Sequence, residues 1–218
     1  MQGDRLSGMK AAIFDMDGTL LDSMGAWRAL NVSFLHSIGA DPTPEQEMAV
    51  YSMTGRAVVD YMRENFGIET DFETLAGRAC RMMEDVYAQG VPHKPGAQQY
   101  LQRLRARGVK CVLATASPSK LALIAMNKSD MVKDMDYIYS TDFVGGHKGD
   151  PAFFDRLCAM IGEKKEDCVM FEDALYSMKG ARAAGLCVVA ITDETNEHDR
   201  EEILAVCDRL IDSYDELD

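Results

Sequence analysis

Two carboxylates stand two residues apart where a short apolar run ends. Asp15 and Asp17 belong to residues 15–20 (DMDGTL), which follow residues 11–14 (AAIF). The apolar run is typical of a buried strand, and Gly18 lets the backbone turn sharply after it. Burying unpaired charge is very costly, so we expect a cation beside the two acids. Mg²⁺, which prefers oxygen ligands, is the natural candidate.

A hydroxyl group stands at the end of a second apolar run, residues 111–114. Thr115 follows that run, and Pro118 suits the first turn of a helix. Free backbone N–H groups at such a helix start, at Ala116 and Ser117, suit a phosphate. By themselves, these residues favour an ordinary helix cap.

A lysine and a second pair of acids follow later in the chain. Lys148 lies in the glycine-rich residues 145–151, where it could neutralise a phosphate as a point charge. By itself it also fits a solvated surface position. Glu172 and Asp173 end the apolar run 168–171 and again need a cation or solvent, although an N-cap is the alternative.

These groups require elements that bring them together. Helical patterns alternate with apolar runs at residues 109–114, 137–139, 168–171, 186–191 and 210–211. Runs that are apolar throughout indicate a parallel sheet covered on both faces. We therefore predict an α/β fold with a Rossmann-like parallel sheet, in which ligands bind at the carboxyl ends of the strands.

Residues 23–91 show helical patterns and no convincing strand. Thr43 to Gln46 combine a capping box with proline at the first helical position, and Thr70 to Glu73 form a second predicted capping box. The pattern predicts four helices inserted after the first strand. The predicted division is a core of residues 1–22 and 92–218 and a helical insert of residues 23–91.

Composition limits the classes of partner. The formal net charge is −13, which argues against nucleic acid because that binding rests on clustered lysine and arginine. No apolar run approaches the roughly 18 residues of a membrane span, and the polar residues 1–8 lack the apolar region of a secretory signal. Six cysteines show no Cys-x-x-Cys pair, so we expect reduced thiols, a cytoplasmic location and no zinc site.

The order acid pair, hydroxyl, lysine, acid pair, each after a strand, resembles the haloacid dehalogenase superfamily, specifically its phosphatase branch. Residues 15–23 (DMDGTLLDS) match the first motif of that family. Thr115 matches the second motif, Lys148 the third, and the Glu172-Asp173 pair the fourth. The helical insert matches the four-helix cap domain of the family. The resemblance covers nearly the whole chain.

The resemblance implies a Mg²⁺-dependent hydrolase of small phosphate monoesters, such as sugar or metabolite phosphates. Asp15 would be the nucleophile that forms an aspartyl-phosphate, and Asp17 the general acid and base. The metal would be held by Asp15, the backbone carbonyl of Asp17, Asp173, and Glu172 directly or through water. Lys148 would also touch Asp15 and keep it ionised.

Thr115 and Lys148 would hold the phosphoryl oxygens, together with the backbone at Ala116 and Ser117. The chain departs from the family at two places. The family lysine is usually followed by proline, whereas Gly149 follows here, and the residues after Asp173 differ from those that often continue the fourth motif. The loop conformation and the support of the acids are therefore expected to differ.

Two residues of the insert are candidates for substrate specificity. Trp27 could stack on a sugar or base, with helix packing as its alternative, and Arg56 could bind a second anionic group, with plain solvent exposure as its alternative. The family resemblance leaves two rival functions. One is a β-phosphoglucomutase, although those enzymes carry a cap histidine at the position that aligns with Trp27, so this chain lacks it. The other is a non-catalytic binding module. The expected partner is a small phosphorylated metabolite, and protein partners are left open.

Overall fold

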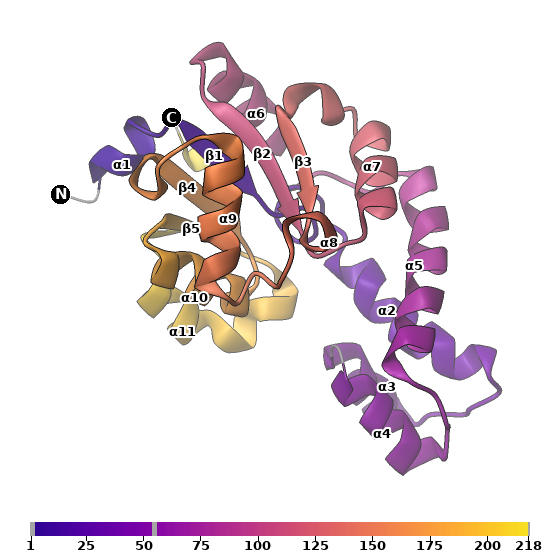
Figure 1. Ribbon diagram of the computed structural model, residues 1–218. Helices are drawn as coiled ribbons and strands as arrows, with labels where there is room; N and C mark the ends of the chain where they lie inside the picture. Colours follow the sequence, from indigo (N-terminus) through magenta and orange to yellow (C-terminus); the bar gives the residue numbers. More distant parts are fainter. Residues whose placement is uncertain (1–2, 54–55, 218) are drawn as a thin grey trace.

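The computed structural model describes residues 3–53 and 56–217, and its centre is a six-stranded sheet (Figure 1). Every neighbouring pair of strands is parallel, in the order β3-β2-β1-β4-β5-β6. The strands are β1 (Ala11–Phe14), β2 (Lys110–Thr115), β3 (Tyr137–Ser140), β4 (Cys168–Glu172), β5 (Cys187–Ile191) and β6 (Arg209–Ile211). The predicted α/β fold with a parallel sheet is confirmed.

Helices cover both faces of the sheet because the strands are apolar on both faces. In β1, Ala12 and Phe14 pack into one apolar cluster, and Ala11 and Ile13 pack into another. The first cluster includes α6 (Ala97–Ala106) and α7 (Ser119–Lys128). The second includes α9 (Pro151–Ile161), α10 (Leu175–Ala184) and α11 (Arg200–Val206). Two shorter helices are α1 (Gly3–Ser7) and α8 (Thr141–Val144).

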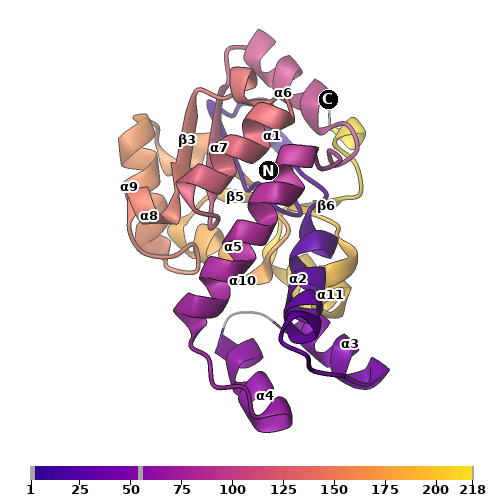
Figure 2. The same ribbon diagram turned by 90° about the vertical axis from the view of Figure 1, so that its right-hand side faces the viewer.

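Four helices follow β1, as the sequence predicts. They are α2 (Met24–Ser37), α3 (Pro44–Ser52), α4 (Arg56–Phe66) and α5 (Phe72–Gln89). Figure 2 shows α3 and α4 farthest from the sheet, with α2 and α5 leading back to it. The outer part has its own apolar cluster, which includes Phe34, Val58 and Met62. Met83 and Tyr87 of α5 belong instead to the main core, so the division into two domains stays a prediction.

The two predicted capping boxes have different outcomes. The Thr43 box is confirmed, since Thr43 Oγ1 accepts from the N–H of Gln46 at 3.3 Å and the Gln46 side chain accepts from the N–H of Thr43 at 2.9 Å. The box at Thr70 is wrong. Asp71 caps α5 instead, and its carboxylate accepts from the N–H of Thr74 at 2.7 Å. Asp71 stands three residues before Thr74, which is the spacing between an N-cap side chain and the backbone N–H that it caps.

The chain leaves and re-enters the sheet region along two adjacent segments. Asp22 N–H donates to the carbonyl of Pro92, and Lys94 N–H to that of Leu20, each at 2.9 Å. The buried Lys94 ammonium binds Asp193, which follows β5, at 2.6 Å and lies 3.7 Å from Asp22. This cluster of charges fixes both segments to the end of β5.

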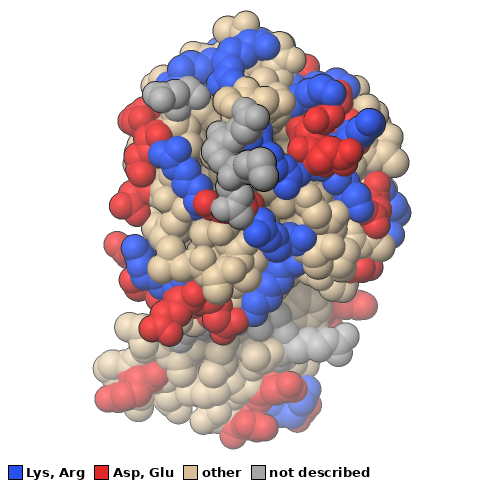
Figure 3. All heavy atoms as spheres, turned by 90° about the vertical axis from the view of Figure 1, so that its left-hand side faces the viewer, with Lys and Arg blue, Asp and Glu red and all other residues tan. Residues whose placement is uncertain are grey.

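The distribution of surface charge, the state of the cysteines and the character of the helices can each be compared with the expectations from composition. On the face shown in Figure 3, basic and acidic side chains are interspersed. All six cysteines are free, and four of them are buried, as the sequence predicts. Within residues 3–53 and 56–217, no helix has the length and apolar character needed to span a membrane.

Candidate active site

The candidate residues meet at the carboxyl ends of three adjacent strands. Asp15 follows β1, Thr115 ends β2 and Glu172 ends β4, and β1 lies between the other two strands. Together with Asp17 and Lys148 they line one cavity of about 600 Å³. The parallel sheet thus brings residues from motifs far apart in the sequence into a single site.

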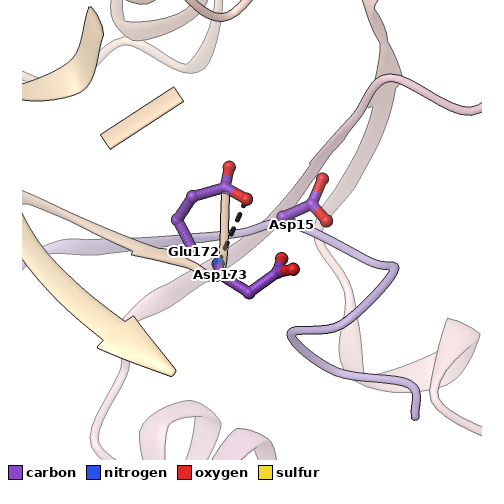
Figure 4. Close-up of side chains that lie close together, drawn as sticks. All are labelled: Asp15, Glu172 and Asp173. Atoms are coloured by element: carbon purple, nitrogen blue, oxygen red, sulfur yellow. Dashed lines mark hydrogen bonds between the residues drawn. The ribbon is translucent and has the colours of Figure 1, made fainter. Parts of the chain in front are cut away.

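Three buried carboxylates form the floor of this cavity. Oxygen atoms of Asp15, Glu172 and Asp173 lie within 4.8 Å of one another, and Figure 4 shows these side chains gathered where their strands end. Glu172 is held in place because one of its oxygens accepts from the N–H of Asp173 at 3.2 Å, the dashed line in Figure 4, and from that of Ala174 at 3.1 Å. The backbone after β4 therefore fixes the orientation of Glu172.

The turn after Asp15 must be made by glycine. Gly18 has a φ of +78°, and a Cβ there would lie 2.3 Å from the Oδ2 atom of Asp173, far inside ordinary contact. The next residue, Thr19, donates its hydroxyl to the other oxygen of Asp173 at 2.9 Å. The first motif therefore also positions an acid of the fourth motif.

Lys148 is 2% exposed, and its ammonium donates to Asp15 and, at 2.9 Å, to Glu172. Burial opposes its charge, but Asp15 and Glu172 outweigh burial and hold the pKa of Lys148 well above its usual value. The solvated alternative for this lysine is wrong. Burial raises the pKa of Asp15 to about 8, whereas Lys148 lowers it, which is the direction expected of a lysine that keeps this acid ionised. That role of Lys148 stays a prediction.

A glycine that the sequence analysis did not single out brings Lys148 into the cavity. Gly180 lies on α10, and a Cβ there would stand 2.1 Å from the carbonyl oxygen of Lys148 and 3.0 Å from the carbonyl carbon of Gly149. The backbone of the lysine loop thus packs directly on the helix. A glycine inside a helical pattern is the signal that could have found it.

Asp17 accepts hydrogen bonds from three hydroxyl groups. Ser23 donates to its Oδ1 atom at 2.5 Å, Tyr87 donates to the same oxygen, and Ser117 donates to Oδ2 at 2.7 Å. These donors come from the start of α2, from α5 and from the loop after β2. Tyr87 could not be found from the sequence, because it lies 70 residues from Asp17 in the chain and carries no local signal.

The loop after β2 differs in detail from expectation. Thr115 Oγ1 accepts from the N–H of Ser117 at 3.0 Å, so that N–H is not free as predicted. Because the Thr115 hydroxyl is the acceptor in this hydrogen bond, its own hydrogen can still be donated to another group. Ala116 is exposed beside the cavity, and Pro118 is the N-cap of α7 and not its first residue. The predicted phosphate-binding roles of Ala116 and Ser117 stay predictions.

The helical insert supplies the far wall of the cavity. That wall is largely apolar and includes Met24, Trp27, Met53, Phe72, Leu75 and Ala79. Trp27 packs against the core, as its helix-packing alternative predicts, and it also lines the cavity. Its stacking on a substrate stays a prediction. The side chain of Arg56 lies outside the described residues, so its role stays a prediction.

The donor set fits a hard divalent cation. The pKa of Asp173 lies well above its usual value, mainly because the carboxyl group is buried and also because the charges of Glu172 and Asp15 are close to it. Lys148 supplies one positive charge to Asp15 and Glu172. A cation bound among the carboxylates would let all three remain ionised, and oxygen ligands are those that Mg²⁺ prefers.

Known proteins are similar to this chain in sequence and in fold. A family model described as haloacid dehalogenase-like hydrolase matches residues 9–185. The chain is 25% identical to a phosphorylated carbohydrates phosphatase of Thermotoga maritima, over 82% of each chain. It is 26% identical to hexitol phosphatase B of Escherichia coli, over 89% of each. A crystal structure of CbbY from Rhodobacter sphaeroides in complex with phosphate has the same fold, with 21% identity, 96% coverage of both chains and a TM-score of 0.78.

Proposed function

The chain belongs to the haloacid dehalogenase-like hydrolases, and we propose that it is a Mg²⁺-dependent phosphatase of small phosphate monoesters. One observation carries the proposal: the buried Asp15 carboxylate shares a cavity with a buried lysine and two further acids. Relatives named as phosphatases of phosphorylated carbohydrates and hexitols support sugar or other metabolite phosphates as the substrate class. The free cysteines support a cytoplasmic location.

The proposed reaction has two steps. In the first, an oxygen of Asp15 bonds to phosphorus while the bond from phosphorus to the alcohol oxygen breaks, and Asp17 gives that oxygen its proton. In the second, Asp17 takes a proton from water, whose oxygen bonds to phosphorus and releases Asp15. The water proton replaces the one given up in the first step, so the enzyme returns to its starting state.

Positive charge must balance the nucleophile and the anionic substrate, because the whole chain carries a net charge of −13. Lys148 already contacts Asp15, and with Thr115 it would hold the phosphoryl oxygens. Asp15, Asp173, the backbone carbonyl of Asp17, and Glu172 directly or through water would hold Mg²⁺. The bound metal supplies charge neutralisation between the carboxylate and the phosphate.

The mutase alternative requires a second phosphoryl transfer back to a sugar. The position that aligns with the mutase histidine is Trp27, whose indole N–H donates to Tyr87 at 3.0 Å. An indole is a donor only, so it cannot take a proton as a histidine can. This contact favours hydrolysis over the mutase reaction. Conversion of β-glucose 1-phosphate to glucose 6-phosphate, and not to glucose, would reverse that preference.

The proposal is tested with a panel of phosphate monoesters assayed for released phosphate in Mg²⁺. We expect turnover of at least one sugar or polyol phosphate, and loss of turnover in Asp15→Asn, which keeps the shape of the side chain but removes its nucleophilic charge. Circular dichroism and thermal unfolding control for folding of the variant. Absence of hydrolysis across the panel would favour the non-catalytic binding module, and a fully active Asp15→Asn would refute the nucleophile assignment.

A further inference from the structure

Tyr87 lies near the C-terminal end of α5, and its hydroxyl donates a hydrogen bond to the side chain of Asp17. It is 1% exposed and lies in the main apolar core. A tyrosine hydroxyl there has lost its water, so both its donor and its acceptor must be satisfied within the protein. The structure satisfies both, because the hydroxyl donates to Asp17 and accepts from Trp27.

The direction of these hydrogen bonds follows from the chemistry of the groups. The indole N–H of Trp27 can only donate, so at 3.0 Å it occupies an acceptor site of the Tyr87 oxygen. The single hydrogen of the Tyr87 hydroxyl is therefore available for the Asp17 carboxylate. Burial, followed by the charge of Asp17, raises the pKa of Tyr87, so the hydroxyl keeps that hydrogen.

The chain of donors connects the helical insert to the catalytic edge of the sheet. Trp27 lies on α2 and Tyr87 on α5, two helices that pack against each other. Asp17 lies in the turn after β1 and lines the cavity. With Ser23 and Ser117 also donating, both carboxylate oxygens are held, and the carboxyl group cannot rotate freely away from the substrate.

We propose that Tyr87, oriented by Trp27, is a positioning residue that holds Asp17 where it can give a proton to the leaving alcohol oxygen. The proposal rests on the proposed phosphatase function, in which Asp17 is the general acid. Tyr87 touches no substrate in this scheme. It acts only through the orientation of Asp17.

Two esters with different leaving groups test this role. An alkyl phosphate, such as the best sugar or polyol phosphate of the panel, expels an alkoxide that needs a proton. p-Nitrophenyl phosphate expels a stable anion that needs little help. The ratio kcat/KM is measured for both esters, since it reports the steps up to release of the alcohol, before water attacks.

In Tyr87→Phe, we expect kcat/KM to fall about tenfold to a hundredfold for the alkyl phosphate, which is at or below the lower end of general-acid effects because Asp17 itself remains. We expect less than about a threefold change for p-nitrophenyl phosphate, because its leaving group needs little protonation. Asp17→Asn should show the same selectivity more strongly. Trp27→Phe, which removes the donor to Tyr87, should show it more weakly.

Tyr100→Phe is the matched control. Tyr100 is also 1% exposed, and its ring packs on Phe14 with 6.4 Å between centroids, so loss of its hydroxyl tests burial without the link to Asp17. This variant should leave the ratio between the two esters unchanged. If Tyr87→Phe does not fold, Trp27→Phe supplies the same comparison.

Each outcome decides the proposal. A selective loss on the alkyl ester in Tyr87→Phe supports it. Equal losses on both esters, or no loss, overturn it while Asp17→Asn still shows that the phosphatase function holds. A wild-type protein that hydrolyses neither ester overturns both the proposed function and this inference.

Discussion

Gly180→Ala places a methyl group where the lysine loop touches α10. The new Cβ would lie 2.1 Å from the carbonyl oxygen of Lys148, whereas ordinary contact begins at 3.4 Å. Its neighbours are backbone atoms of Lys148 and Gly149, which cannot rotate aside as a side chain tip can. The loop must therefore move away from the helix by about 1 Å, the same order as misplacements that impair catalysis.

The displacement acts on activity more than on folding. Lys148 contacts Asp15 and Glu172, and a shift of about 1 Å in a positioned group costs about a hundredfold in rate. Overpacking destabilises by about 1 to 3 kcal/mol, while replacing a helical glycine by alanine returns about 1 kcal/mol. We expect kcat/KM to fall about a hundredfold and the free energy of unfolding to fall by about 1 kcal/mol.

Gly77→Ala is the control for this substitution. Gly77 is also inside a helix, α5, but a Cβ there would meet only the Arg81 guanidinium at 3.7 Å, which is ordinary contact. We expect this variant to be more stable by about 0.5 to 1 kcal/mol and fully active. Stability is measured by denaturant unfolding, and activity with the best ester of the panel.

A Gly180→Ala variant that keeps kcat/KM within about twofold of the wild type would refute this role of the glycine, since a shift of the lysine loop should cost about a hundredfold. Equal losses of activity in both glycine variants would refute it as well, because the contact between α10 and the lysine loop would then have no special effect. A loss of activity in Gly180→Ala alone, in a folded protein, is the expected result.

Removing divalent cations with EDTA should abolish turnover, and Mg²⁺ should restore it. Burial raises the pKa of Asp15 to about 8, above the value of about 4 in the unfolded chain, so the metal-free protein loses stability as pH rises between these values. The rise in Tm on adding Mg²⁺ should thus be larger at pH 8 than at pH 6, and an equal rise at both would contradict this. Asp193→Asn should destabilise the protein by about 3 kcal/mol at pH 7, since it leaves the buried Lys94 ammonium with the neutral carbonyl of Thr192 and only the more distant carboxylate of Asp22. Burial opposes ionisation of Asp193, but hydrogen bonds from Lys94 and Thr195 outweigh it and lower the pKa. The stabilisation by ionised Asp193 is present above about pH 4 and is lost as pH falls through the folded pKa. In denaturant unfolding, the free energies of unfolding of wild type and variant should therefore converge in acid. A difference that stays constant with pH would exclude the ion pair as its source.

Local patterns could predict the strands and the positions of the acids. Each strand is an apolar run, and the first acid pair and Glu172-Asp173 follow directly in the sequence. A run of apolar residues and a charge at its end are properties of neighbouring residues, so a single sequence reveals them. The sequence does not decide between Thr70 and Asp71 as the cap, because two residues in succession could cap the helix and only the backbone geometry selects one.

The sequence by itself determined which chemical groups are available: two acid pairs, a threonine and a lysine, each after a strand of a parallel sheet. Only the tertiary structure decided what those groups touch. It buried Lys148 between two carboxylates, turned the Ser117 hydroxyl toward Asp17, and placed Tyr87 against the same carboxylate. The physical reason is that these contacts join residues 24 to 133 positions apart, and such pairs form when helices and strands pack, leaving no trace in local residue order.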